Sequence, residues 1–107
     1  MPDNHVTVVA TEVAPFVHVD ERAMVLCDGR HTVVLDAARL RWASETLEVL
    51  ADEGRATRTQ HTHTLGGFRT PDDQVVLYAV SEQTAVSLSV SAEDFQTLRS
   101  RLPKRSA

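Results

Sequence analysis

The chain has 107 residues, a length that fits one domain and leaves no room for a second hydrophobic core, so we expect residues 1–107 to fold as one unit. With 42% hydrophobic and 24% charged residues, its composition is that of a folded globular protein and excludes the disordered class. The formal net charge is -4, no apolar run reaches the roughly 20 residues that span a bilayer, and the start has no signal-peptide pattern, which predicts a cytoplasmic protein without membrane contact.

The first third of the chain is predicted to form strands. Its β-branched and apolar segments are 6–13, 16–19, 23–27 and 31–35. The last two flank Asp28-Gly29, a dipeptide that favours the two positive φ angles of a type I′ turn. This pattern predicts a β-hairpin.

A helix is predicted over 37–52, because apolar residues recur there at spacings of three and four. Its buried stripe is Leu40, Ala43, Leu47 and Leu50. Asp36 stands where an N-cap belongs, and Gly54 stands where a left-handed residue ends a helix.

The second half repeats this alternation of strands and helix. Its predicted segments are an edge strand at 55–65, a turn at Gly66-Gly67, a brief return at 68–70, a central strand at 74–80 and a strand at 84–90. Ser91 is expected to cap a second helix, which Pro103 ends. The apolar stripe of that helix is Phe95, Leu98 and Leu102.

This order predicts an α+β fold, with a curved antiparallel sheet and both helices packed on one face, since each helix has one apolar stripe. A shift of 55 residues aligns Val33 with Leu88 and Asp36 with Ser91. The match suggests two ββββα pseudo-halves at 5–53 and 55–102, followed by a short basic tail at 103–107. A coincidence between two ordinary strand-to-helix junctions explains the match equally well, and both interpretations stay open.

The order ββββα-ββββα resembles the Whirly and PUR-repeat families and the single-repeat dimers of the related transcriptional coactivator family. The resemblance covers nearly the whole chain, rests on element order, size and pseudo-symmetry, and includes no signature motif. It implies binding of single-stranded nucleic acid across a curved sheet rather than catalysis. The chain departs from these families in having few basic and aromatic residues; its aromatic residues are Phe16, Trp42, Phe68, Tyr78 and Phe95.

Charge is distributed unevenly along the chain. Residues 1–53 contain ten acidic residues and four arginines, whereas 54–107 contain five acidic and seven basic residues. No carboxylate occurs in 55–70, and the candidate nucleic-acid-binding residues of this span are Arg55, Arg58, His61, His63, Phe68 and Arg69. Arginine binds phosphate and phenylalanine stacks on bases, which predicts weak, salt-dependent binding of single-stranded DNA or RNA. The competing interpretation is an edge strand that uses charge to stay soluble.

The sequence contains no complete metal or catalytic set. His61 and His63 are expected on one face of a strand, but two ligands are fewer than the three or four that zinc uses. Cys27 is the only cysteine and is expected to be a small buried hydrophobe. We therefore expect no metal site, no cofactor and no enzymatic activity.

Trp42 and Val49 lie off the apolar stripe of the first helix, where they either widen the core face or mark a partner surface. Two functions follow. The first is a small non-enzymatic regulator that binds nucleic acid through residues 55–69. The alternative is a protein-interaction module, of the antitoxin-like, immunity-like or dimerising adaptor kind, that uses the acidic half or the first helix.

Overall fold

The structure is a computed structural model that describes residues 14–103, so the strand expected at 6–13 lies outside the described residues. In chain order the elements are β1 (Phe16–Val19), β2 (Ala23–Cys27), β3 (Thr32–Asp36), the 3-10 helix η1 (Ala37–Arg39), α2 (Leu40–Glu53), β4 (Arg55–Gln60), β5 (His63–Arg69), β6 (Gln74–Val80), β7 (Ala85–Ser91) and α3 (Ala92–Arg101).

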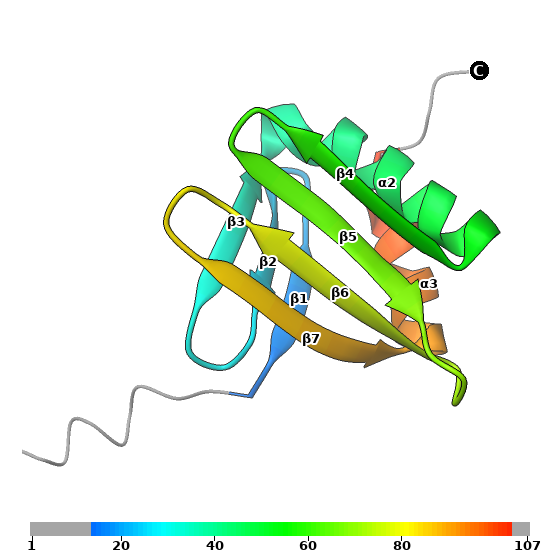
Figure 1. Cartoon of the computed structure of the whole chain (residues 1–107). Coiled ribbons are helices and arrows are strands. Elements are labelled where there is room, and N and C mark those ends of the chain that lie inside the picture. The colour runs from blue at the N-terminus through cyan, green and yellow to red at the C-terminus, as the bar shows by residue number, and fades with distance from the viewer. Residues whose placement is uncertain (1–13, 104–107) are drawn as a thin grey trace, which may run out of the picture.

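The strands form two antiparallel sheets, with orders β1-β2-β3 and β4-β5-β6-β7. Figure 1 shows the four-stranded sheet facing the viewer, with α2, α3 and the three-stranded sheet behind it. α2 packs on β4 and β5, α3 packs on β6 and β7, and β2 and β3 meet β7. The α+β class with both helices on one face of a sheet is confirmed, and the strands are divided between two sheets.

The pseudo-repeat stays a hypothesis, because within residues 14–103 three strands precede α2 and four precede α3. The hydrophobic core lies between the four-stranded sheet and the layer behind it. Both helices bury the stripes that the sequence predicts, and β7 buries Val86 and Leu88 while Ser87 and Ser89 are exposed. Such alternation arises because successive side chains of a strand point to opposite faces.

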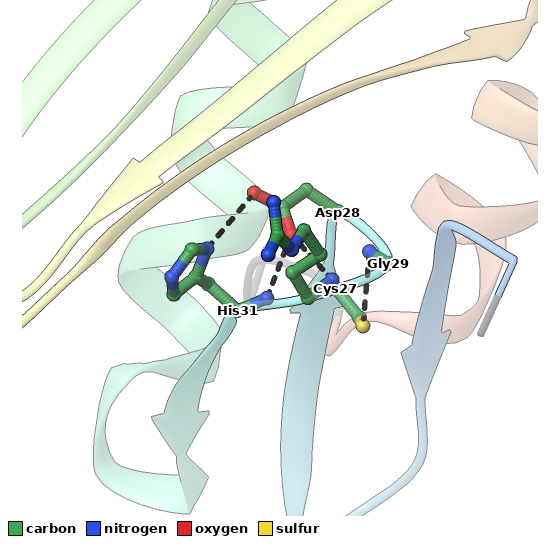
Figure 2. A network of polar contacts seen from close by, with 5 residues as sticks. Cys27, Asp28, Gly29 and His31 are labelled. Carbon is green, nitrogen blue, oxygen red and sulfur yellow. Dashed lines mark hydrogen bonds and ion pairs between the residues drawn. The ribbon is translucent and has the colours of Figure 1, made fainter. Parts of the chain in front are cut away.

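The hairpin between β2 and β3 is confirmed, but its turn is not type I′. Cys27 pairs with Thr32, which leaves a loop at 28–31, and of the dipeptide only Gly29 has a positive φ, of 104°. The Asp28 carboxylate accepts hydrogen bonds from the backbone N–H groups of His31 (2.7 Å) and Arg30 (2.8 Å), and Figure 2 shows this network. These two donors stabilise the ionised carboxylate and lower the pKa of Asp28.

The lowered pKa predicts a pH dependence of stability. A carboxyl group whose pKa is lower in the folded than in the unfolded state stabilises the fold above its unfolded pKa, and this contribution is lost as the pH falls through the folded pKa. We expect Asp28→Asn to lower the urea midpoint at pH 7, and the difference from wild type to shrink as the pH falls below the ordinary value of 3.8. A difference that stays constant down to strongly acidic pH would contradict this assignment.

The ends of the helices agree with the sequence except at Asp36. The helix expected over 37–52 is confirmed as η1 followed by α2, and Gly54 ends it at φ 82°, with its N–H donating to the Leu50 carbonyl. Ser91 caps α3 by accepting from the N–H of Asp94. The prediction of Asp36 as an N-cap is wrong, because its side chain makes no capping hydrogen bond and accepts one from Arg39 instead.

The turn expected at Gly66-Gly67 is wrong. β4 ends at Gln60, the chain turns at 61–62, and β5 continues through both glycines. A Cβ on Gly66 would lie 2.6 Å from the Ala56 carbonyl oxygen and 2.7 Å from the Tyr78 ring, which no side chain tolerates. The glycines therefore allow close approach of neighbouring groups inside the sheet, a second common role of glycine in strands.

Candidate interaction surface

Three of the predicted nucleic-acid-binding residues lie at one corner of the four-stranded sheet. Arg55 at the start of β4 pairs with Phe68 near the end of β5, so the two share a face. Arg69 follows Phe68 and pairs with Val75, so it lies on the opposite face of the sheet. Phe68 is 44% exposed and both arginines are exposed. Neither arginine side chain makes a hydrogen bond or an ion pair with another residue of 14–103.

The other three predicted residues lie elsewhere, so the single basic patch expected from the sequence does not form. Arg58 is on the α2 side of β4, where its Nη1 lies 3.5 Å from Glu45 Oε1. His61 is in the turn, with φ 56°. His63 begins β5 beside this turn, whereas Arg55 lies at the far end of the β4–β5 hairpin. The expected His61–His63 pair on one strand face is therefore wrong, and within the described residues no cluster of three metal-ligating side chains occurs.

The two predicted partner-interface residues differ in burial. Trp42 is 7% exposed and belongs to the core, so its assignment to a partner surface is wrong and the alternative, a widened core face, is correct. Val49 is 37% exposed on the flank of α2 beside β4. Only Val49 of this pair is available to a partner.

The face of the four-stranded sheet that points away from the helices is uncovered by the described residues (Figure 1). Residues that pair across strands share a face, and their neighbours Val75, Leu77 and Ala79 point into the core. The uncovered face consists of Arg55, Thr57, Thr59, Thr64, Gly66, Phe68, Gln74, Val76, Tyr78, Val80, Ala85, Ser87, Ser89 and Ser91. No carboxylate is among them, although the chain has fifteen.

The uncovered face has an apolar centre and an uncharged polar border. Val76, Tyr78 and Val80 lie at alternate positions along β6, and Phe68 of β5 pairs with Val76. Hydroxyl groups border this centre on β4 and β7. On the β4 side, Thr57 hydrogen-bonds the Tyr78 hydroxyl and Thr59 hydrogen-bonds Thr64 at 2.9 Å. An apolar centre inside a polar rim is the usual anatomy of a protein interface.

Most of this surface was missed by sequence reasoning, which named only Arg55 and Phe68 among its members. The alternation in 84–90 already indicated that Ser87 and Ser89 face water. Nothing in the sequence shows that Tyr78 and Val80 share this face with them, because that depends on the pairing of β6 with β7. Recognition of the surface required the sheet order.

The flank of α2 carries ion pairs beside the same sheet. Arg99 of α3 donates to both carboxylate oxygens of Glu48, at 2.7 and 3.1 Å. The hydrogen bond to Glu48 raises the pKa of Arg99 above its ordinary value, so this guanidinium stays charged. Together with the Arg58–Glu45 pair, it lines a hollow of about 660 Å³ between α2, β4 and the end of α3.

Comparison of the chain with known protein families, with curated proteins and with solved structures found no match. The resemblance to single-stranded nucleic-acid-binding families therefore remains an expectation that no relative tests. Among the helices of residues 14–103, none has the length and apolar character needed to cross a membrane.

Proposed function

We propose that the protein is an interaction module that dimerises through the uncovered face of its four-stranded sheet. The observation that carries this proposal is the composition of that face, which has an apolar centre and no carboxylate in a chain with a net charge of -4. This is the dimerising form of the protein-interaction function that the sequence leaves open.

Charge favours a second copy as the occupant of this face. Two molecules of equal negative charge repel one another, so self-association is favoured at a contact where neither presents acidic side chains. Arg55 is the only charged residue on the uncovered face and lies at its corner, at the start of an edge strand. A two-fold axis between two such faces can place the two copies of Arg55 at opposite corners, which avoids a clash of like charges.

The size of the face sets the expected affinity. Four strands about 4.8 Å apart and about six residues long, at about 3.3 Å per residue, cover roughly 400 Å² per copy. Stable interfaces bury about 800 Å² per partner, so this contact is small. We therefore expect a reversible dimer whose population depends on protein concentration.

Sedimentation velocity over a series of concentrations, from low micromolar to near millimolar, tests the proposal. The weight-average mass is expected to rise from 11.8 kDa toward twice that value. A mass that stays at 11.8 kDa over the whole series would overturn the proposal.

A second candidate function is weak binding of single-stranded nucleic acid at the corner formed by Arg55, Phe68 and Arg69. It is favoured by two exposed arginines that form no ion pair among the described residues. Arg55 shares the face of the exposed Phe68 ring, and Arg69, next to Phe68 in the chain, lies on the opposite face at the same corner. Two phosphate contacts predict a slope of about -1.4 in a plot of log affinity against log salt concentration.

Fluorescence anisotropy with labelled oligothymidylate measures this slope. We expect Arg55→Ala to halve it and Phe68→Ala to weaken binding about tenfold or more without changing it, because stacking is sequence-tolerant and uncharged. Arg101→Ala, at the exposed end of α3 and outside this corner, is the matched control for loss of one positive charge. Absence of binding by wild type at low salt would exclude this function.

A further inference from the structure

We infer that the outer edge of β4, with which no other strand of residues 14–103 pairs, is a docking site for an extended peptide segment in which an acidic residue stands next to an apolar residue. The inference goes beyond the proposed dimer, because it uses the backbone at the edge of the sheet rather than its uncovered face.

The register shows which backbone groups of β4 are available. The N–H of Arg69 donates to the carbonyl of Gly54 at 2.8 Å, and these two residues lie opposite one another, one step beyond the Arg55–Phe68 pair. Hydrogen-bonded and non-hydrogen-bonded pairs alternate along an antiparallel ladder. The N–H and C=O groups of Arg55, Thr57 and Thr59 therefore point away from β5, toward the free edge of the sheet.

Two hollows adjoin this edge, one on the α2 side and one that extends around the edge to the uncovered face. The hollow on the α2 side has a volume of about 660 Å³, and the one next to Arg55, Thr57 and Phe68 about 790 Å³. Val49 and Arg58 line both. A peptide added as a fifth strand would direct alternate side chains into these two hollows, which is how strand addition combines backbone affinity with side-chain specificity.

Proteins often protect such edges with charges, proline or bulges, and the charges on β4 are two arginines, Arg55 and Arg58. The strand has no proline and no carboxylate, and its inward-pointing charge, Arg58, is paired with Glu45 of α2. The positive charge of Arg58 is therefore directed toward the helix, and its side chain does not exclude an added strand by repulsion.

The side chains beside the edge indicate the chemistry of the peptide. On the α2 side, Val49 is an exposed apolar residue. The hollow that it lines contains as many arginines as carboxylates. On the other side, Arg55 lies on a face without carboxylates. Glu53 lines the hollow beside Arg55, but among the described residues Glu53 and Arg55 form no ion pair with each other. A carboxylate near Arg55 and an apolar side chain near Val49 fit these contacts. Because Arg55 and Val49 lie on opposite sides of the edge, the two peptide residues are neighbours in sequence.

Two synthetic peptides test the assignment: one of alternating threonine and valine with a glutamate before its central valine, and a twin with lysine in place of glutamate. Amide hydrogen exchange by NMR is expected to show new protection at Arg55, Thr57 and Thr59 with the glutamate peptide. The lysine twin is expected to bind about fivefold more weakly, the size of an exposed ion-pair effect. Equal affinity of the twins, or protection at other amides, would overturn the inference.

Thr57→Pro and Thr57→Ala form a matched pair, because both remove the hydroxyl that bonds Tyr78 and only proline removes the edge amide. Proline is tolerated where the N–H faces away from the ladder, so β4 is expected to remain paired with β5. We expect Thr57→Pro to weaken peptide binding at least about tenfold and Thr57→Ala to change it less than about twofold. Equal binding by the two variants would exclude the edge.

If Thr57→Pro does not fold, Arg55→Glu provides the test. This variant should bind the lysine peptide more tightly than the glutamate peptide, the reverse of wild type. An unchanged preference would contradict the inference. Ser87→Glu, on the far strand β7, separates this site from the proposed dimer. It should leave peptide binding unchanged whether or not the protein dimerises.

Discussion

Ser87→Glu is expected to raise the dissociation constant of the dimer at least about a hundredfold, which corresponds to about 2.7 kcal/mol. Ser87 is exposed, pairs with Tyr78 at the centre of the uncovered face, and makes no packing contact with the core. A carboxylate there must lose its hydration when two faces meet, and it approaches the apolar centre of the face, whereas the only cation of the face, Arg55, lies at its corner. The monomer should keep its fold.

The matched control is Ser87→Gln, which adds a side chain of the same size without charge. We expect it to weaken the dimer by less than about tenfold, because an amide is far less costly to desolvate than a carboxylate. Sedimentation velocity compares the three proteins, and thermal unfolding verifies that their stabilities agree. Dimerisation of the glutamate variant at wild-type concentrations would show that the contact lies on another surface.

Trp42→Ala is expected to lower the free energy of unfolding by about 3–5 kcal/mol, the usual cost of removing a large aromatic side chain from a core. Trp42 is 7% exposed and packs in the core cluster, although it lies off the apolar stripe of α2. Small domains have a total stability of about 5–15 kcal/mol, so this variant is expected to be close to unfolding.

Urea denaturation measures the loss, with Val49→Ala as the control on the same helix. Val49 is 37% exposed, so we expect its truncation to cost less than about 1 kcal/mol. Trp42→Phe, which keeps an aromatic ring, should give an intermediate loss. If Trp42→Ala retained wild-type stability but changed the mass in solution, Trp42 would be a partner contact after all.

The sequence predicted well those features that depend on neighbours within a few residues. The helix ending at Gly54 and the Ser91 cap of α3 were both predictable, because a positive φ or a capping hydroxyl involves residues within one turn of helix. The hairpin at 28–31 was also predictable, although its turn type was not.

The candidate site was predictable only in part. Arg55 and Phe68 were identified from the carboxylate-free span and do lie together on the uncovered face. The carboxylate-free span also contains His61 and His63. The sequence does not show that the chain reverses at 61–62, which places these two histidines away from Arg55. Arg58 directly follows Thr57 in β4, yet it is paired with Glu45 of α2, thirteen residues earlier. Only the packing of α2 beside β4 reveals this pair.

Propensity, capping and periodicity act over short distances, so the sequence alone predicts the two helices, the stripe that each helix buries and the described strands outside 55–70. The face that each strand leaves uncovered, and the residues that meet on it, depend on how distant segments pack. Gly66 shows the reason. It reads locally as a turn, yet it lies in a strand because the ring of Tyr78, twelve residues later, occupies the space above it. Contacts between segments distant in the chain determine such positions, and those contacts exist only once the sheet has formed.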